Sequence, residues 1–106
     1  MFHSLPDLYG AVSPETNSER VLVVGYWFQV VQGENDLDGF QINRELRHLG
    51  HGIINITTAL SSLIDRKPQL VIQTRKSGNS KQARKRYRLT DAGIKVVQQM
   101  IFNLEP

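Results

Sequence analysis

Nine basic residues fall between positions 66 and 88, and no acidic residue interrupts them. The rest of the chain holds four basic and ten acidic residues, so the positive charge is concentrated in one segment. Clustered lysine and arginine side chains neutralise phosphate groups, which makes a polyanion the expected partner of this segment. A segment that merely keeps a surface hydrated is the alternative interpretation.

Short polar residues lie before the basic segment, between apolar residues at helical spacing. Ile53, Ile56 and Leu60 predict the buried stripe of a helix, which leaves the polar residues on the opposite face. An asparagine amide can bond adenine twice, and a threonine offers a hydroxyl and a methyl group to thymine. A solvent-exposed helix start, with asparagine and threonine as caps, is the alternative. The base-reading residues predicted on this face are Asn55, Thr57, Thr58 and Ser61, with Ser62 beside them.

Ile54 stands next to these polar residues and has two interpretations. It either completes the apolar core or contacts the methyl group of a thymine.

Phosphate contacts are expected from two further elements. The helix before the polar one carries Arg44 and Arg47 outside its apolar stripe. The segment after the polar helix combines β-prone residues with a turn, so its cations would lie around the tip and the outer face of a hairpin. These hairpin cations are Arg75, Lys76, Lys81, Arg84, Lys85 and Arg86.

Other kinds of chemistry have little support in the sequence. The absence of cysteine excludes disulfides, thiolate nucleophiles and zinc fingers. His48 and His51 have an H-x-x-H spacing, but no acidic third ligand stands at a metal-like distance, so phosphate contact or simple exposure is expected. No glycine-rich phosphate loop and no Ser/His/Asp grouping is present. We therefore expect no enzymatic activity, no cofactor and no metal.

The N-terminal part predicts an arm followed by an apolar helix. Residues 1–16 carry two prolines and apolar residues without regular spacing, which indicates an irregular arm. Asn17 and Ser18, which follow the arm, are good helix caps. The helix then continues through Val21 to Val31 and ends near Gly33. Because only Gln29 is strongly polar in that run, either the arm or a second subunit must cover the exposed side.

Two helices in tandem are predicted next. Asp38 and Gln41 fit a capping box for a helix that ends at the turn 50–52. The polar helix described above then spans 53–67, because Pro68 disfavours the helical conformation of the residue before it.

A hairpin and a final helix complete the predicted elements. Residues 70–75 and 84–89 are β-prone, and the turn 77–80 separates them. Thr90 caps a last helix with an apolar stripe from Gly93 to Leu104, and Val96 and Phe102 lie off that stripe. The predicted fold class is therefore α+β, mainly helical with one small β-hairpin, and residues 17–106 form the folded domain.

The order of these elements resembles the winged helix-turn-helix superfamily over residues 18–104. The resemblance rests on the helix-turn-helix segment from Phe40 to Lys67 and on the junction Tyr87-Arg-Leu-Thr-Asp-Ala-Gly93. That junction is similar to the one in bacterial regulators of the multiple-antibiotic-resistance and phenolic-acid-responsive types. The resemblance implies that the third helix, 53–67, enters the major groove of DNA and that the hairpin, or wing, contacts phosphates and the minor groove.

Sequence-specific binding of duplex DNA by a transcriptional regulator is the expected function. A homodimer is expected through the helix around Val21–Val31 and the last helix, since such modules commonly read two half-sites. No secretory signal or membrane span is predicted, so we expect a cytoplasmic protein. The alternatives are a protein-interaction winged helix within a larger complex and binding of RNA or structured nucleic acid.

Overall fold

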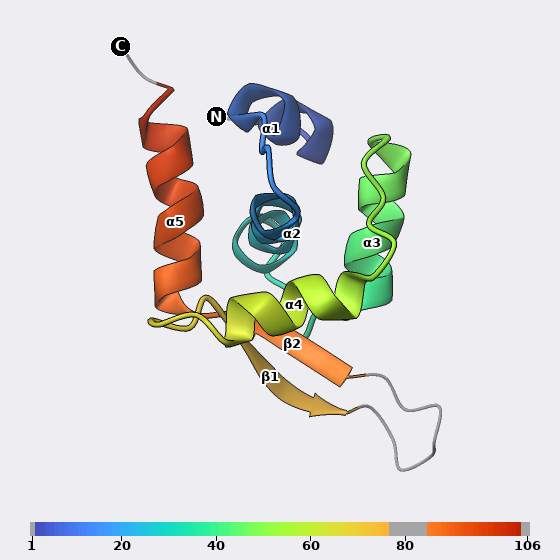
Figure 1. Cartoon of the computed structure of the whole chain (residues 1–106). Helices are drawn as coiled ribbons and strands as arrows, with labels where there is room; N and C mark the ends of the chain where they lie inside the picture. The colour runs from blue at the N-terminus through green and yellow to red at the C-terminus, as the bar shows by residue number, and fades with distance from the viewer. Residues whose placement is uncertain (1, 77–84, 105–106) are drawn as a thin grey trace.

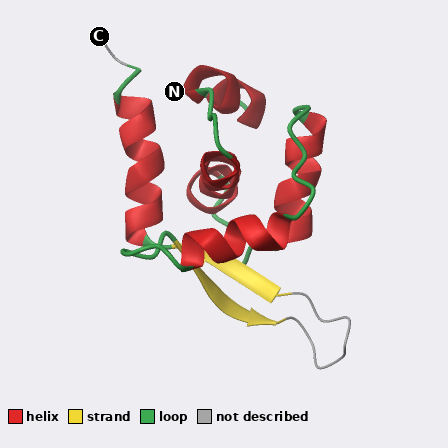
Figure 2. Ribbon diagram, viewed as in Figure 1, coloured by secondary structure: helices red, strands yellow, loops and turns green. Residues whose placement is uncertain are grey.

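The computed structural model describes residues 2–76 and 85–104. Most of these residues are helical and two strands form an antiparallel sheet, which confirms the predicted α+β class (Figure 1; Figure 2). Within these ranges, no helix combines the length and the apolar character that a bilayer crossing requires. The elements are α1 (Leu5–Val12), α2 (Asn17–Tyr26), the π-helical turn η1 (Trp27–Val31), α3 (Gly39–His48), α4 (Ile56–Ile64), β1 (Val71–Lys76), β2 (Lys85–Leu89) and α5 (Asp91–Phe102).

Helix α2 lies at the centre of the molecule. Figure 1 shows it nearly end-on, with α1 above it, α3 and α5 on its two sides and α4 below it. Four consecutive residues of α2, from Val21 to Val24, are fully buried. A helix that is apolar nearly all round is expected where helices pack against it from several sides. One chain therefore supplies the partners that the sequence of α2 requires.

The prediction of an irregular arm over residues 1–16 is wrong, because residues 5–12 form α1. The Ser4 side chain accepts a hydrogen bond from the backbone N–H of Asp7 and caps the helix. Pro6 stands in the first turn, where its missing N–H costs nothing. Leu5, Leu8 and Tyr9 are buried in the shared core, and α1 packs against α2. The arm alternative for covering α2 is thus the one that the structure shows.

The ends of α2 differ slightly from those predicted. Its cap is Thr16 and not Asn17 or Ser18, and Glu19 completes a reciprocal capping box. The backbone N–H groups of Glu15 and Thr16 donate hydrogen bonds to the Glu19 carboxylate and hold the pKa of Glu19 below its ordinary value. At the other end, the helix widens into η1, which contains Gln29.

Helices α3 and α4 form the predicted tandem with shorter bounds for α4. Asp38 caps α3 by accepting a hydrogen bond from the backbone N–H of Gln41 at 2.7 Å, as predicted. The Gln41 side chain contacts Glu34, however, and does not return to the cap. Helix α4 begins at Ile56 and ends at Ile64, so the predicted span 53–67 was too long at both ends.

The sheet joins segments that are far apart in the chain. Strand β1 pairs antiparallel with β2, and the register shifts between Gln73 and Arg75. On its other side β2 forms an isolated antiparallel bridge from Tyr87 to Leu37, with two backbone hydrogen bonds of 2.7 and 2.9 Å. Helix α5 then starts at the Thr90 cap, as predicted.

Candidate nucleic-acid interface

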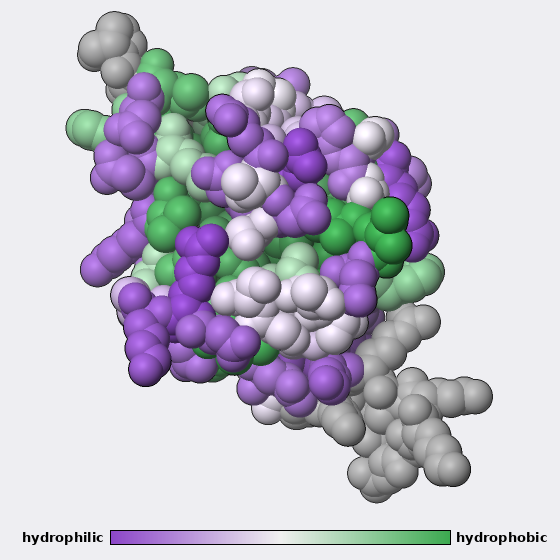
Figure 3. Space-filling view, viewed as in Figure 1, coloured by the Kyte–Doolittle hydropathy of each residue, from purple (hydrophilic) through white to green (hydrophobic). Residues whose placement is uncertain are grey.

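The exposed side of α4 carries four short hydroxyl residues, and we call it the hydroxyl face. Its opposite side is anchored in the core by Ala59, Leu60 and Leu63. Figure 3, which looks onto this side of the molecule, shows a pale, weakly polar surface over α4 with strongly hydrophilic residues below it and an apolar band above. Short side chains allow another molecule to approach the helix backbone closely. The residues of the hydroxyl face are Thr57, Thr58, Ser61 and Ser62, all of them exposed.

Asn55 has the capping role that the sequence left open as an alternative. Its Oδ1 atom accepts a hydrogen bond from the backbone N–H of Thr58 at 3.1 Å. Asn55 is exposed at the start of α4, and it lines a hollow together with Thr58 of the hydroxyl face.

The start of α4 is fixed by Asn43, a residue that the sequence analysis did not single out. Its amide nitrogen donates to the carbonyl oxygen of Ile53 at 2.8 Å, and its amide oxygen accepts from the Ile53 backbone N–H at 2.8 Å. Asn43 is 5% exposed, so both bonds are shielded from water. An asparagine one position after the apolar Ile42 and three before Leu46 was the available signal for such a buried role.

A second amide side chain makes an equivalent pair of backbone hydrogen bonds at the end of β2. Gln29 donates from Nε2 to the Leu89 carbonyl at 3.1 Å and accepts from the Leu89 backbone N–H at 2.9 Å. This pair of bonds fastens η1 to the last residue of β2, directly before the Thr90 cap of α5. The hairpin is therefore held at its base by a contact that spans sixty residues.

Five of the six cations predicted on the hairpin fall into three groups. Lys85 is exposed on β2. Arg75 and Lys76 lie in β1, opposite Arg86 and Lys85 in the register. Lys81 and Arg84 lie outside the described residues.

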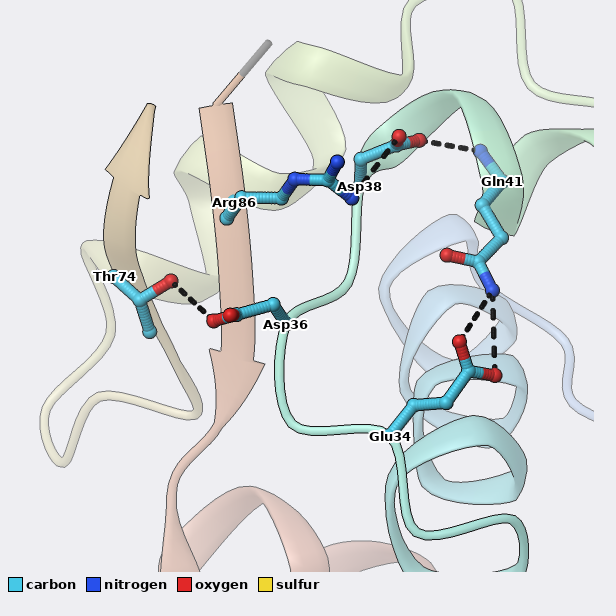
Figure 4. A network of polar contacts seen from close by, with 6 residues as sticks. All are labelled: Glu34, Asp36, Asp38, Gln41, Thr74 and Arg86. Carbon is cyan, nitrogen blue, oxygen red and sulfur yellow. Dashed lines mark hydrogen bonds and ion pairs between the residues drawn. The ribbon is translucent and has the colours of Figure 1, made fainter. Parts of the chain in front are cut away.

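Arg86 has an intramolecular partner, which the sequence analysis did not foresee. Its guanidinium Nη1 lies 3.4 Å from Oδ2 of Asp38, and its side chain is 28% exposed. Figure 4 shows this pair within a polar network that also joins Thr74 of β1 to Asp36 at 3.2 Å. The acidic loop before α3 thus neutralises part of the positive charge at the base of the hairpin. Arg86 therefore stabilises the fold as well as adding positive charge.

Helix α3 presents its two predicted arginines to solvent. The Nε atom of Arg44 lies 3.7 Å from Oε2 of its neighbour Glu45, which partly neutralises the positive charge of the arginine. Arg47 crosses the turn after α3, and a β-carbon at Gly52 would lie 2.7 Å from its Cγ atom. Gly52 therefore leaves room for the arginine stem. Arg47 also lines a hollow of about 460 Å³ between α3, α4 and β2, together with Lys85 and the partly exposed Phe40.

The two histidines near the turn have different neighbours. His51 Nδ1 lies 2.6 Å from the Tyr9 hydroxyl, so this imidazole ties the turn after α3 to α1. Burial raises the pKa of Tyr9, and the nearby Arg20 partly offsets that effect. His48 lies 4.0 Å from Glu45 at the exposed end of α3. In the part of the chain that the structure describes, no three histidine, aspartate or glutamate side chains cluster as metal ligands would.

The structure brings three of the predicted site residues together around the hollow between α3, α4 and β2, namely Arg47, Thr57 and Lys85. Asn55, Thr58 and Ser62 line a separate hollow next to the start of α2. No protein family, curated protein or solved structure was found to match this chain.

Proposed function

We propose that the chain is a winged helix-turn-helix protein that binds duplex DNA in a sequence-dependent way and regulates transcription. In this proposal α4 enters the major groove, which is wide enough for a helix, and the hairpin contacts the phosphate backbone beside it. The observation that carries the proposal is the hydroxyl face of α4, a row of exposed short polar residues on a helix whose other side is firmly buried.

The strand arrangement supports the winged-helix part of the proposal. The bridge between Leu37 and Tyr87 places a short extended segment before the helix-turn-helix and pairs it with the second strand of the hairpin. A hairpin fixed to the rest of the fold along β2 has a defined position relative to α4. This is the geometry in which a helix and a wing can contact neighbouring parts of one duplex.

The charge distribution supports the DNA part of the proposal. The segment 66–88 contains nine basic residues, and Lys85 and Arg88 are exposed on β2. Contacts of this kind supply affinity for any duplex, and release of counterions makes that affinity decrease as the salt concentration rises. Base contacts from α4 would then add the preference for one sequence.

Replacing the hydroxyl face tests the sequence-dependent part. A DNA sequence selected from a random pool by the wild-type protein should bind at least about a thousandfold more tightly than random DNA. The triple variant Thr57→Ala, Thr58→Ala, Ser61→Ala is expected to lower that ratio at least about tenfold, because contacts to base edges are lost. Fluorescence anisotropy titrations with both duplexes measure the ratio.

Lys85→Ala is the matched comparison, since it removes a phosphate contact and leaves α4 unchanged. It should weaken binding to both duplexes equally and reduce the slope of log affinity against log salt by about one. Gln32→Ala, at the exposed end of η1, is the control that should change neither quantity. Equal binding of selected and random DNA by the wild-type protein would refute sequence-specific regulation.

We propose that the homodimer forms through α5. The apolar residues of α2 are covered within one chain, whereas Val30 and Val31 of the following turn η1 are exposed. Phe102 is 71% exposed and Leu104 is also exposed at the end of α5. We propose that two copies associate there and place two α4 helices on neighbouring half-sites.

Phe102→Ser should therefore lower the solution mass. Sedimentation equilibrium is expected to give twice the monomer mass for the wild-type chain and the monomer mass for the variant. Val31→Ser, at an exposed apolar residue of η1, should leave the mass unchanged. A monomeric wild-type protein would exclude the dimer and leave DNA binding to a single half-site.

A further inference from the structure

Two consecutive isoleucines in the turn between α3 and α4 differ in their exposure to solvent. Ile53 is buried, and both of its backbone hydrogen-bonding groups are bound by Asn43. Ile54 is 105% exposed, the highest value among the large apolar side chains with described burial. Because the Asn43 amide fixes the backbone of Ile53, the two side chains cannot exchange places without breaking both hydrogen bonds. The exposure of Ile54 is therefore imposed by the fold.

A local structural role does not account for Ile54. It precedes the Asn55 cap of α4, and an apolar residue in that position often packs against the fourth residue of the helix. That residue is Ala59, which is buried, whereas Ile54 is fully exposed. The packing that would make Ile54 part of the helix start is absent, so its side chain contributes little to the stability of α4.

Ile54 adjoins the hydroxyl face. It lines a shallow hollow of about 420 Å³ together with Asn55, Thr58 and Ser62, on the side where α4 meets the start of α2. The apolar band that borders the pale surface of α4 in Figure 3 shows that this side of the face changes from polar to apolar character. A partner that lies along the hydroxyl face from Ser62 to Thr58 would next meet an isoleucine at the N-terminal end of the helix.

We propose that Ile54 is a specificity-determining residue that contacts the C5-methyl group of a thymine in the major groove. The proposal rests on the DNA-binding function proposed above. The methyl group of thymine is the apolar feature of the major-groove edge of a base pair, and apolar side chains recognise it. A branched aliphatic side chain that is fully exposed beside residues able to form hydrogen bonds with bases complements that surface.

Replacing thymine by deoxyuridine, which lacks the methyl group, isolates this contact. Each thymine of the selected duplex is replaced in turn, and affinities are measured for the wild-type protein and for Ile54→Ala. At one thymine, the wild-type protein should lose about fourfold in affinity, the equivalent of one buried methyl group. Ile54→Ala should bind the two duplexes within a factor of about 1.5 at that position. Val31→Ala, an exposed aliphatic residue of η1, is the matched control and should keep the full methyl dependence.

The outcomes separate this inference from the proposed function. A selected site without a methyl-dependent thymine, or an equal methyl dependence in Ile54→Ala and wild type, overturns the role of Ile54 and leaves DNA binding intact. Failure to select any preferred sequence overturns both proposals. Because Ile54 is fully exposed, Ile54→Ala should keep the wild-type melting temperature within about 2 °C, which thermal unfolding verifies.

Discussion

Gly93→Ala is expected to lower the free energy of unfolding by about 3 kcal/mol, the upper part of the usual range for overpacking. A β-carbon at this position would lie 2.1 Å from the carbonyl oxygen of Leu70. That oxygen is backbone and also accepts a hydrogen bond from the N–H of Thr90, so it cannot move without breaking the junction between β2 and α5. Helix α5 must instead move away from the start of β1. Thermal unfolding should show a melting temperature lowered by about 15 °C.

Gly10→Ala provides the control for this variant. Gly10 is an exposed residue of α1, and a β-carbon there meets no atom within 4 Å. The same chemical change should therefore raise stability by about 0.5 kcal/mol, because alanine loses less conformational entropy in a helix than glycine. Similar effects of the two changes would contradict the close approach of Gly93 to Leu70.

Asn43→Ala is expected to cost about 3 kcal/mol, because it leaves the buried N–H and carbonyl groups of Ile53 without partners. Chemical denaturation followed by circular dichroism measures this loss. The variant should also lose part of the preference for a selected DNA sequence at temperatures where it remains folded, since Asn43 positions the start of α4. This second readout separates a positioning role from a purely stabilising one.

Asn17→Ala is the matched control for Asn43. Asn17 is exposed, and its amide oxygen accepts a long hydrogen bond of 3.4 Å from Arg20. Its removal should change the free energy of unfolding by less than about 0.5 kcal/mol. If Asn43→Ala had as small an effect, water would be satisfying the Ile53 backbone, and the proposed positioning of α4 by Asn43 would be wrong.

Apolar spacing and capping residues were sufficient to predict most of the elements. Asp38 and Thr90 cap α3 and α5 as expected. In β2, the buried Tyr87 and Leu89 alternate with the exposed Arg88, as a half-buried strand requires. Helix α1 was missed because Pro6 was interpreted as a sign of irregular structure, although proline is well tolerated in a first turn. The spacing of Leu5, Leu8 and Tyr9 was the signal that a helix was present.

The residue types of the candidate site could be predicted from the sequence, but the partners that its residues have within the chain could not. The sequence placed the hydroxyl face correctly on the exposed side of α4, because periodicity defines which side is buried. It could not assign Asp38 to Arg86 or Gln29 to Leu89, which are separated by 48 and 60 residues. Such contacts depend on the tertiary arrangement and leave no period in the sequence. For the same reason the α4 start was placed too early, since Asn43 holds Ile53 outside the helix.

The two oxygens of Asp38 have a mechanical consequence. One oxygen binds the first turn of α3 and the other binds Arg86 of β2, so a single side chain connects the helix start with the strand. The backbone bridge from Leu37 to Tyr87 fixes the same place a second time. With both connections made at adjacent residues, the base of the hairpin has no independent hinge relative to α3. We therefore expect a torque applied to the base of the hairpin to be transmitted to α3.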